Sequence, residues 1–282
     1  MSKHKSVLAP SLRIEPSRLF VKDLAKVGAF YHRIVGLDVL EQTSGHMLLG
    51  YGKAPIIDLI SKPEYSTAPM PSAGLFHHAI VFASQAELAK TLLNIAEQAP
   101  DSYEGSADHL VSEAFYFHDP EFNGLELYYD RPETTWQWDG ESVKMDSLPL
   151  NPQEFIEQHL GHSGSAAKTL GHVHLRVGDI PTARKFYVDQ LGFDATADFG
   201  SALFISVGGY HHHFGMNVWQ SKGAGMRAPS LGLAETTLLL PNSTYIDALA
   251  NRLTGLNTPF ESKNKGISLQ DPWGNTLVIR AD

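Results

Sequence analysis

The sequence has no cysteine among its 282 residues, and this absence excludes disulfide bonds, thiolate metal sites and cysteine nucleophiles. Long apolar runs are also missing, since none approaches the roughly 20 residues that a membrane span needs. The basic N-terminal segment has no apolar stretch of signal-peptide type behind it. A net charge of −9 without a basic block argues against a nucleic-acid partner. We therefore expect a cytoplasmic protein with no membrane partner, whose chemistry uses His, Glu, Asp and Tyr side chains.

What the sequence does contain is an internal repeat. Three segments of the first half recur in the second half at similar offsets, which is the signature of a duplicated structural unit. The pairs are 21–39 with 177–195, 74–82 with 232–240, and 119–127 with 271–279. The sequence therefore predicts two related halves. We place the N-terminal pair of units in residues 1–150 and the C-terminal pair in residues 151–282.

Each half divides again into two units that share one pattern. A short β-rich run leads to a helix cap, a helix and then several strand-like runs. The predicted caps are Asp23, Ser84, Asp179 and Ser243, and Ser84 with Glu87 forms a capping-box pattern. The expected fold class is therefore α+β, with four βαβββ modules in two tandem halves.

Four βαβββ modules in one chain resemble the vicinal oxygen chelate superfamily, which includes glyoxalase I, the bleomycin- and fosfomycin-resistance proteins, and the extradiol dioxygenases. Four segments are similar in particular to the bacterial catechol-2,3-dioxygenase group. They are AGLFHHAIV (73–81), DHLVSEAFYFHDPEFNGLELYYDRP (108–132), LGHVHLRV (170–177) and GGYHHHFGMNVW (208–219). The resemblance implies that modules pair and curl into cups with a metal inside. In the dioxygenases two histidines and one glutamate hold Fe(II), and Mn(II) can use the same N,N,O donors.

The repeat narrows the choice of metal ligands. The family takes one His from the first strand of one module, and a His and a Glu from the first and last strands of its partner module. The aligned residues are His172 with Pro16, His77 with Glu235, and Glu126 with Val278. Only modules two and three retain such ligands, so the resemblance implies that His77, Glu126 and His172 bind the metal. Modules two and three must then share one cup, while modules one and four pair without metal. His174 shares a strand face with His172 and is the alternative ligand on that strand.

Three consecutive histidines occupy positions 211–213. In an extended strand His211 and His213 would share one face, with His212 on the other. The resemblance places an acid–base histidine on the last strand of module three, because ring cleavage needs a group that takes and returns a proton near neutral pH. The family pattern falls at His213, and His212 and His211 are the alternatives.

Two further residues precede Glu126, as a histidine and a tyrosine precede the glutamate of the dioxygenases. By this resemblance Tyr116 hydrogen-bonds a substrate oxygen, and His109 stabilises negative charge on bound oxygen or substrate. A purely structural aromatic is the alternative interpretation of Tyr116.

The resemblance implies an extradiol ring-cleaving dioxygenase that converts catechol or a substituted catechol, with Fe(II) and O₂, to a muconic semialdehyde. It also implies a homo-oligomer. One alternative is a metal-dependent isomerase or thiol transferase of glyoxalase type, which usually employs more carboxylate ligands than this sequence offers. The other is a non-catalytic protein that binds a small molecule such as an antibiotic and lacks metal ligands.

Overall fold

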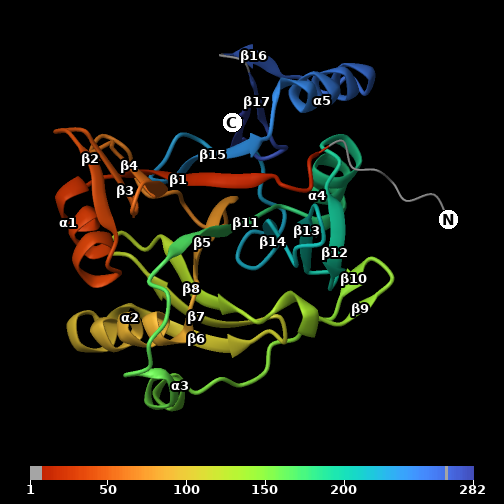
Figure 1. Ribbon diagram of the computed structural model, residues 1–282. Coiled ribbons are helices and arrows are strands. Elements are labelled where there is room, and N and C mark those ends of the chain that lie inside the picture. Colours follow the sequence, from red (N-terminus) through yellow and green to blue (C-terminus); the bar gives the residue numbers. More distant parts are fainter. Residues whose placement is uncertain (1–7, 264–265) are drawn as a thin grey trace.

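The computed structural model describes residues 8–263 and 266–282, and four βαβββ modules account for most of it (Figure 1). Module one consists of β1 (Arg13–Val21), α1 (Leu24–Ala29), the helical turn η1 (Phe30–Ile34), β2 (Asp38–Gln42), β3 (His46–Tyr51) and β4 (Ala54–Ser61). Module two consists of β5 (Gly74–Phe82), α2 (Gln85–Gln98), η2 (Pro100–Ser102), β6 (Tyr103–Asp108), β7 (Ser112–His118) and β8 (Gly124–Asp130).

The second half repeats this order after a connection that carries η3 (Glu133–Thr135), β9 (Trp138–Asp139), β10 (Ser142–Val143) and α3 (Pro152–His159). Module three consists of β11 (Lys168–Arg176), α4 (Ile180–Arg184), η4 (Lys185–Gln190), β12 (Asp194–Asp198), β13 (Ala202–Ser206) and β14 (Phe214–Asn217). Module four consists of β15 (Gly232–Leu240), α5 (Ser243–Gly255), β16 (Glu261–Lys263), β17 (Gly266–Gln270) and β18 (Thr276–Ala281). The α+β fold class and the four modules are thus as the sequence predicts.

The helices begin at or next to the predicted caps. The side chains of Asp23 and Asp179 each accept a hydrogen bond from the backbone N–H three residues on, at 2.9 and 2.8 Å. In module four the predicted cap Ser243 is wrong by one residue. Asn242 accepts from the backbone N–H of Thr244 at 3.0 Å, because Asn caps a helix as well as Ser does, and Ser243 is the first helical residue. None of the helices within the described residues is long and apolar enough to cross a membrane.

The strands form two eight-stranded sheets, and each sheet combines modules from both halves of the chain. The first sheet has the order β16-β17-β18-β15-β1-β4-β3-β2 and joins modules one and four through the antiparallel pair β1 and β15. The second has the order β12-β13-β14-β11-β5-β8-β7-β6 and joins modules two and three through β11 and β5. In Figure 1, β1 and β15 lie together above β5 and β11. The predicted pairing of module two with module three is therefore confirmed.

Buried side-chain hydrogen bonds connect consecutive modules, although those modules belong to different sheets. The hydroxyl of Tyr31 in module one contacts Nε2 of His78 at 2.9 Å and donates to a carboxylate oxygen of Asp119 at 3.3 Å, both in module two. The repeat places Tyr187 and Asp271 in the same relation, with a 3.0 Å hydrogen bond between modules three and four. These side chains are almost fully buried within the continuous apolar core. Each half is thus held together internally while its two modules pair with the other half.

Candidate metal centre

Three neighbouring strands of the second sheet carry His77, Glu126 and His172. Strand β5 lies between β11 and β8, so that its Ala79 is opposite His172 on one side and beside Glu126 on the other. His77 lies two residues before Ala79 and therefore shares its face of the sheet. Because the methyl group of Ala79 is small, the three longer side chains can converge above it.

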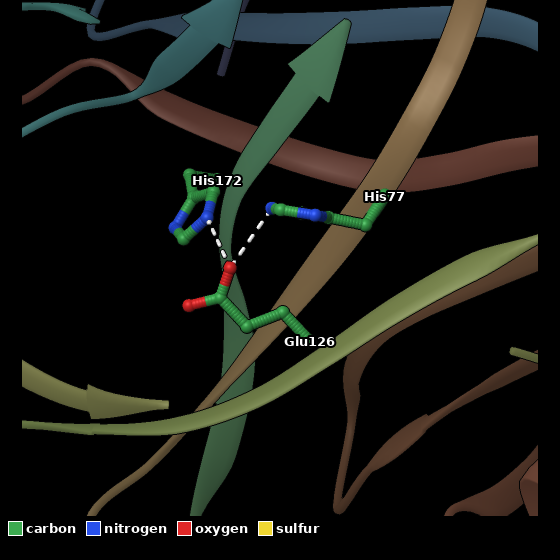
Figure 2. Close-up of side chains that lie close together, drawn as sticks. All are labelled: His77, Glu126 and His172. Atoms are coloured by element: carbon green, nitrogen blue, oxygen red, sulfur yellow. Dashed lines mark hydrogen bonds and ion pairs between the residues drawn. The ribbon is translucent and has the colours of Figure 1, made fainter. Parts of the chain in front are cut away.

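The three side chains meet at one carboxylate oxygen, as Figure 2 shows. Oε2 of Glu126 lies 2.8 Å from Nε2 of His77 and 3.1 Å from Nε2 of His172. The nearest ligand atoms of the three residues all lie within 4.8 Å of one another. All three side chains are buried, with at most 5% of any residue exposed. The structure therefore brings together the three residues that the repeat singles out.

The charges in this cluster suit a divalent cation. Burial acts to raise the pKa of Glu126, but the imidazoles of His172 and His77 outweigh it and hold the pKa of this carboxyl well below its usual range. Burial lowers the pKa of His172, against the opposing effect of Glu126. The cluster thus presents an anionic carboxylate and a neutral imidazole, which are the protonation states that metal binding requires.

Two nitrogen atoms of the cluster, Nε2 of His77 and Nδ1 of His172, have no hydrogen-bond partner within the part of the chain that the structure describes. Nε2 of His77 is buried and close to Glu126, but the directions of the two groups do not meet the geometry of a hydrogen bond. A buried nitrogen left in this way is costly unless something else satisfies it. A metal ion between the three side chains would do so, and two imidazole nitrogens with one carboxylate oxygen fit Fe(II) or Mn(II).

A cavity of about 530 Å³ opens beside the cluster. Its described lining combines two members of the cluster with three further histidines and with aromatic and apolar side chains. It also includes the carboxylates of Glu104 and Asp146, but no lysine or arginine among the described residues. Among the histidines and aromatic residues of the lining are His109, Tyr116, His174, His212, Phe76, Phe204 and Trp219. A space of this size is typical of small-molecule sites.

His109 and Tyr116 lie together on the wall of this cavity, next to the cluster. Nδ1 of His109 is 2.7 Å from the backbone carbonyl of Asp146, and its Nε2 is 2.6 Å from the hydroxyl of Tyr116. Because a carbonyl only accepts, the neutral ring carries its proton on Nδ1, and Nε2 accepts from the Tyr116 hydroxyl. Burial, with a contribution from Glu126, raises the pKa of Tyr116 well above its usual value, so this phenol keeps its proton. The ring of Tyr116 lies 5.6 Å from that of His77.

The histidine run does not form the strand that the sequence predicts. Strand β14 begins at Phe214, and residues 211–213 lie in the connection before it. Gly208 and Gly209 both have positive φ angles, of 71° and 85°, and turn the chain so that strand alternation is not yet established. The predicted placement of His211 and His213 on one face is therefore wrong.

The three histidines instead face three different surroundings. His212 lines the cavity, with its ring centroid 4.1 Å from that of His172. His213 is absent from the described lining of the cavity, and its Nδ1 is 2.7 Å from the hydroxyl of Ser206. His211 is completely buried, and its Nε2 is 2.7 Å from Oδ1 of Asp130. Of the run, it is thus His212 that can reach a bound ligand.

His174 also faces the cavity but is held differently from His172. Its ring lies 4.8 Å from that of His77, and the side-chain amide of Asn217 donates to its Nε2 at 3.0 Å. It does not belong to the group of three whose ligand atoms lie within 4.8 Å of one another.

The sequence did not predict two residues that contact the histidines of the site, Asn217 and Asp130. Asp130 could have been found from its even spacing to Glu126, because residues two and four apart on a strand share a face.

Comparisons with known proteins agree with the fold described above. The family model of the Glyoxalase/Bleomycin resistance protein/Dioxygenase superfamily matches residues 169–279. A catechol-2,3-dioxygenase of Bacillus subtilis (strain 168) is 34% identical over 275 residues, which cover 93% of this chain and 94% of that protein. Among solved structures, glyoxalase I from Zea mays is similar with a TM-score of 0.58 at 15% identity, covering 95% of this chain and 92% of that one. The cppA protein from Streptococcus pneumoniae TIGR4 is similar with a TM-score of 0.61 at 13% identity, covering 99% of each chain. The two structures share the fold with this chain.

Proposed function

The chain belongs to the glyoxalase/bleomycin resistance protein/dioxygenase superfamily, and we propose that it is an extradiol dioxygenase that cleaves the ring of a catechol with Fe(II) and O₂. The observation that carries this proposal is the buried group of His77, Glu126 and His172 beside a cavity of small-molecule size. The 34% identical relative that bears the name catechol-2,3-dioxygenase supports it. A chain that only binds a small molecule has no need of three buried ligand groups that meet at one point.

The donor set also separates this proposal from glyoxalase-type chemistry. His77, Glu126 and His172 include a single carboxylate, and the other carboxylates of the cavity lining, Glu104 and Asp146, belong to exposed residues. Three protein donors would leave room on a bound metal ion for the diol and O₂. A bound Fe(II) would supply the place where diol and O₂ meet and exchange electrons.

A side chain of the protein must accept a proton from the substrate and return it. The reaction adds both atoms of O₂ to the catechol and forms a carboxylic acid, whose ionisation releases one proton to solvent at neutral pH. The diol proton has to leave the substrate on binding, and a proton has to be supplied to oxygen when the O–O bond breaks, so one group that accepts and returns a proton serves both steps. We assign this task to His212, because it lines the cavity against His172. Burial, aided by the nearby imidazoles, lowers the pKa of His212 well below its usual value, so the ring is neutral and able to accept.

Other side chains hold the substrate. The hydroxyl group of Tyr116 donates a hydrogen bond to Nε2 of His109 and keeps its lone pairs to accept from a substrate hydroxyl. The rings of Phe76 and Phe204 give the aromatic substrate an apolar surface and exclude water, with Phe204 4.9 Å from the ring of His212. Trp219, whose ring lies 5.5 Å from that of Phe76, is 47% exposed and belongs to the entrance.

The same cavity favours a substrate without negative substituents. Its described lining includes the carboxylates of Glu104 and Asp146 but no lysine or arginine to pair with an anionic group. A carboxylated catechol would lose hydration on entering and meet like charges. We therefore propose catechol, or a catechol with neutral apolar substituents, as the substrate class.

The test is a turnover assay on protein loaded with Fe(II) under anaerobic conditions. Catechol is added, then air, and O₂ uptake is followed together with the yellow absorbance of the ring-fission product. We expect one O₂ consumed per catechol, and loss of turnover in Glu126→Gln. Metal analysis that finds bound iron in a protein that turns over no catechol of a neutral or carboxylated panel would reject the proposal. Isomerisation of a thiol–methylglyoxal adduct by the same sample would establish the glyoxalase alternative instead.

A further inference from the structure

A chain of hydrogen bonds leads from His212 to described residues that do not line the cavity. Nδ1 of His212 lies 2.7 Å from Nδ1 of His211, and Nε2 of His211 lies 2.7 Å from Oδ1 of Asp130. The other carboxylate oxygen of Asp130 accepts from the hydroxyl of Tyr210 at 2.8 Å. The Tyr210 hydroxyl is in turn 2.8 Å from that of Tyr128. The chain thus connects His212, which lies against His172, to Asp130 and Tyr128 of β8, four and two residues after Glu126.

We propose that Asp130 and His211 are positioning residues that hold His212 in one orientation and one tautomer, with its proton on Nδ1 and its Nε2 bare. This proposal rests on the proposed function, because it explains how His212 is presented to a substrate. Neither Asp130 nor His211 lines the cavity within the described residues, so they act through His212.

The tautomer follows from counting donors and acceptors. Because a carboxylate oxygen accepts, Nε2 of His211 donates to Oδ1 of Asp130, while Oδ2 accepts from Tyr210. A His211 ring that carries one proton then has none on Nδ1 and accepts there. The 2.7 Å contact between the two Nδ1 atoms therefore requires His212 to donate from its Nδ1. The nitrogen that remains for the cavity, Nε2 of His212, carries a free lone pair.

The surroundings of His211 hold its ring in place. The residue has no exposed surface, and its ring packs against those of Trp136 and Tyr210 at centroid distances of 5.0 and 4.2 Å. The packing fixes the ring plane, so that the orientation of His212 is set before a substrate arrives.

Two variants of His211 separate this role from simple packing. His211→Asn keeps an acceptor oxygen near the position of Nδ1, whereas His211→Leu is apolar and has none. In the Fe(II)-loaded protein we expect His211→Leu to lower kcat by about 100-fold, the lower range for a positioned acid–base group. The KM for catechol should stay within a few-fold, because substrate contacts are intact. His211→Asn should recover most of kcat. Equal losses in both variants, or wild-type kcat in His211→Leu, would overturn the proposal.

A second measurement does not depend on turnover. In Zn(II)-loaded wild-type protein with ¹⁵N-labelled histidines, long-range ¹⁵N–¹H correlation spectra report which ring nitrogen carries the proton. We expect the Nδ1–H form for His212, and a shift towards the other tautomer in His211→Leu. The Nε2–H form in the wild type would contradict the inference even if the enzyme cleaves catechol. If the wild type has no ring-cleaving activity but His212 is the Nδ1–H form, the proposed function fails and the positioning remains.

Discussion

Binding of a metal ion by His77, Glu126 and His172 should stabilise the folded protein, and Glu126→Gln should abolish that effect. The carboxylate is the one anionic donor of the group, and its Oε2 is the atom within 3.1 Å of both imidazoles. A ligand that binds only the folded state at 100 times its Kd adds about 2.7 kcal/mol to the free energy of unfolding. At about 2–4 °C per kcal/mol for a chain of this size, the melting temperature should rise by about 5–11 °C.

The assay is thermal unfolding of tag-free protein with and without Fe(II) under anaerobic conditions, and with Mn(II) in air. Glu235→Gln is the matched control, because Glu235 takes the repeat-aligned position of His77 and pairs with Arg18 at 2.9 Å in the other sheet. The Glu235→Gln protein should have a slightly lower melting temperature than the wild type, but metal should raise that temperature by the same amount. The reasoning would be refuted by a wild-type protein that is indifferent to both metals, or by Glu126→Gln protein that responds as the wild type does.

Three other regions of the molecule offer tests. Burial lowers the pKa of His213 to about 4, so stability is full above its unfolded value of 6.5 and falls as the pH drops from 6.5 towards 4. The loss reaches about 3 kcal/mol, and urea titrations should show it reduced in His213→Asn. Replacing Glu104 and Asp146 by their amides should raise kcat/KM for a carboxylated catechol relative to catechol by about three- to tenfold at low salt, and less at high salt. Tyr31→Phe should lower the free energy of unfolding by about 1–3 kcal/mol, measured by urea denaturation, because buried partners lose their hydrogen bond. An unchanged pH profile, charge preference or urea midpoint would contradict the respective argument.

The module pairing could be predicted because the two copies of the repeat have diverged at the ligand positions. His77 faces Glu235 in the alignment and His172 faces Pro16, so a complete set of ligands exists in modules two and three alone. That asymmetry is a property of the sequence, and it determines which strands must be neighbours. The helix cap of module four was misplaced by one residue, since Asn242 and Ser243 are equally good caps and packing decides between them.

The arrangement of the histidine run could not be predicted from periodicity. Alternation holds only once the chain is in a strand, and the turn at Gly208 and Gly209 delays β14 until residue 214. The contact of His211 with Asp130 joins module three to module two across 81 residues. The spacing of Asp130 from Glu126 indicates its strand face, but no local pattern predicts its partner. Whether the three cluster residues bind metal stays a prediction, although the structure brings them together.

The crossed pairing of modules also bears on how copies of this chain could combine. Module two meets module three through the edges of β5 and β11, and the chain between β8 and β11, residues 131–167, joins them. The edges of β5 and β11 would form the same backbone hydrogen bonds whether they belong to one molecule or to two. If the connection were too short to span that distance, β11 could reach β5 only on a second copy. Each group of His77, Glu126 and His172 would then combine residues of two exchanged chains.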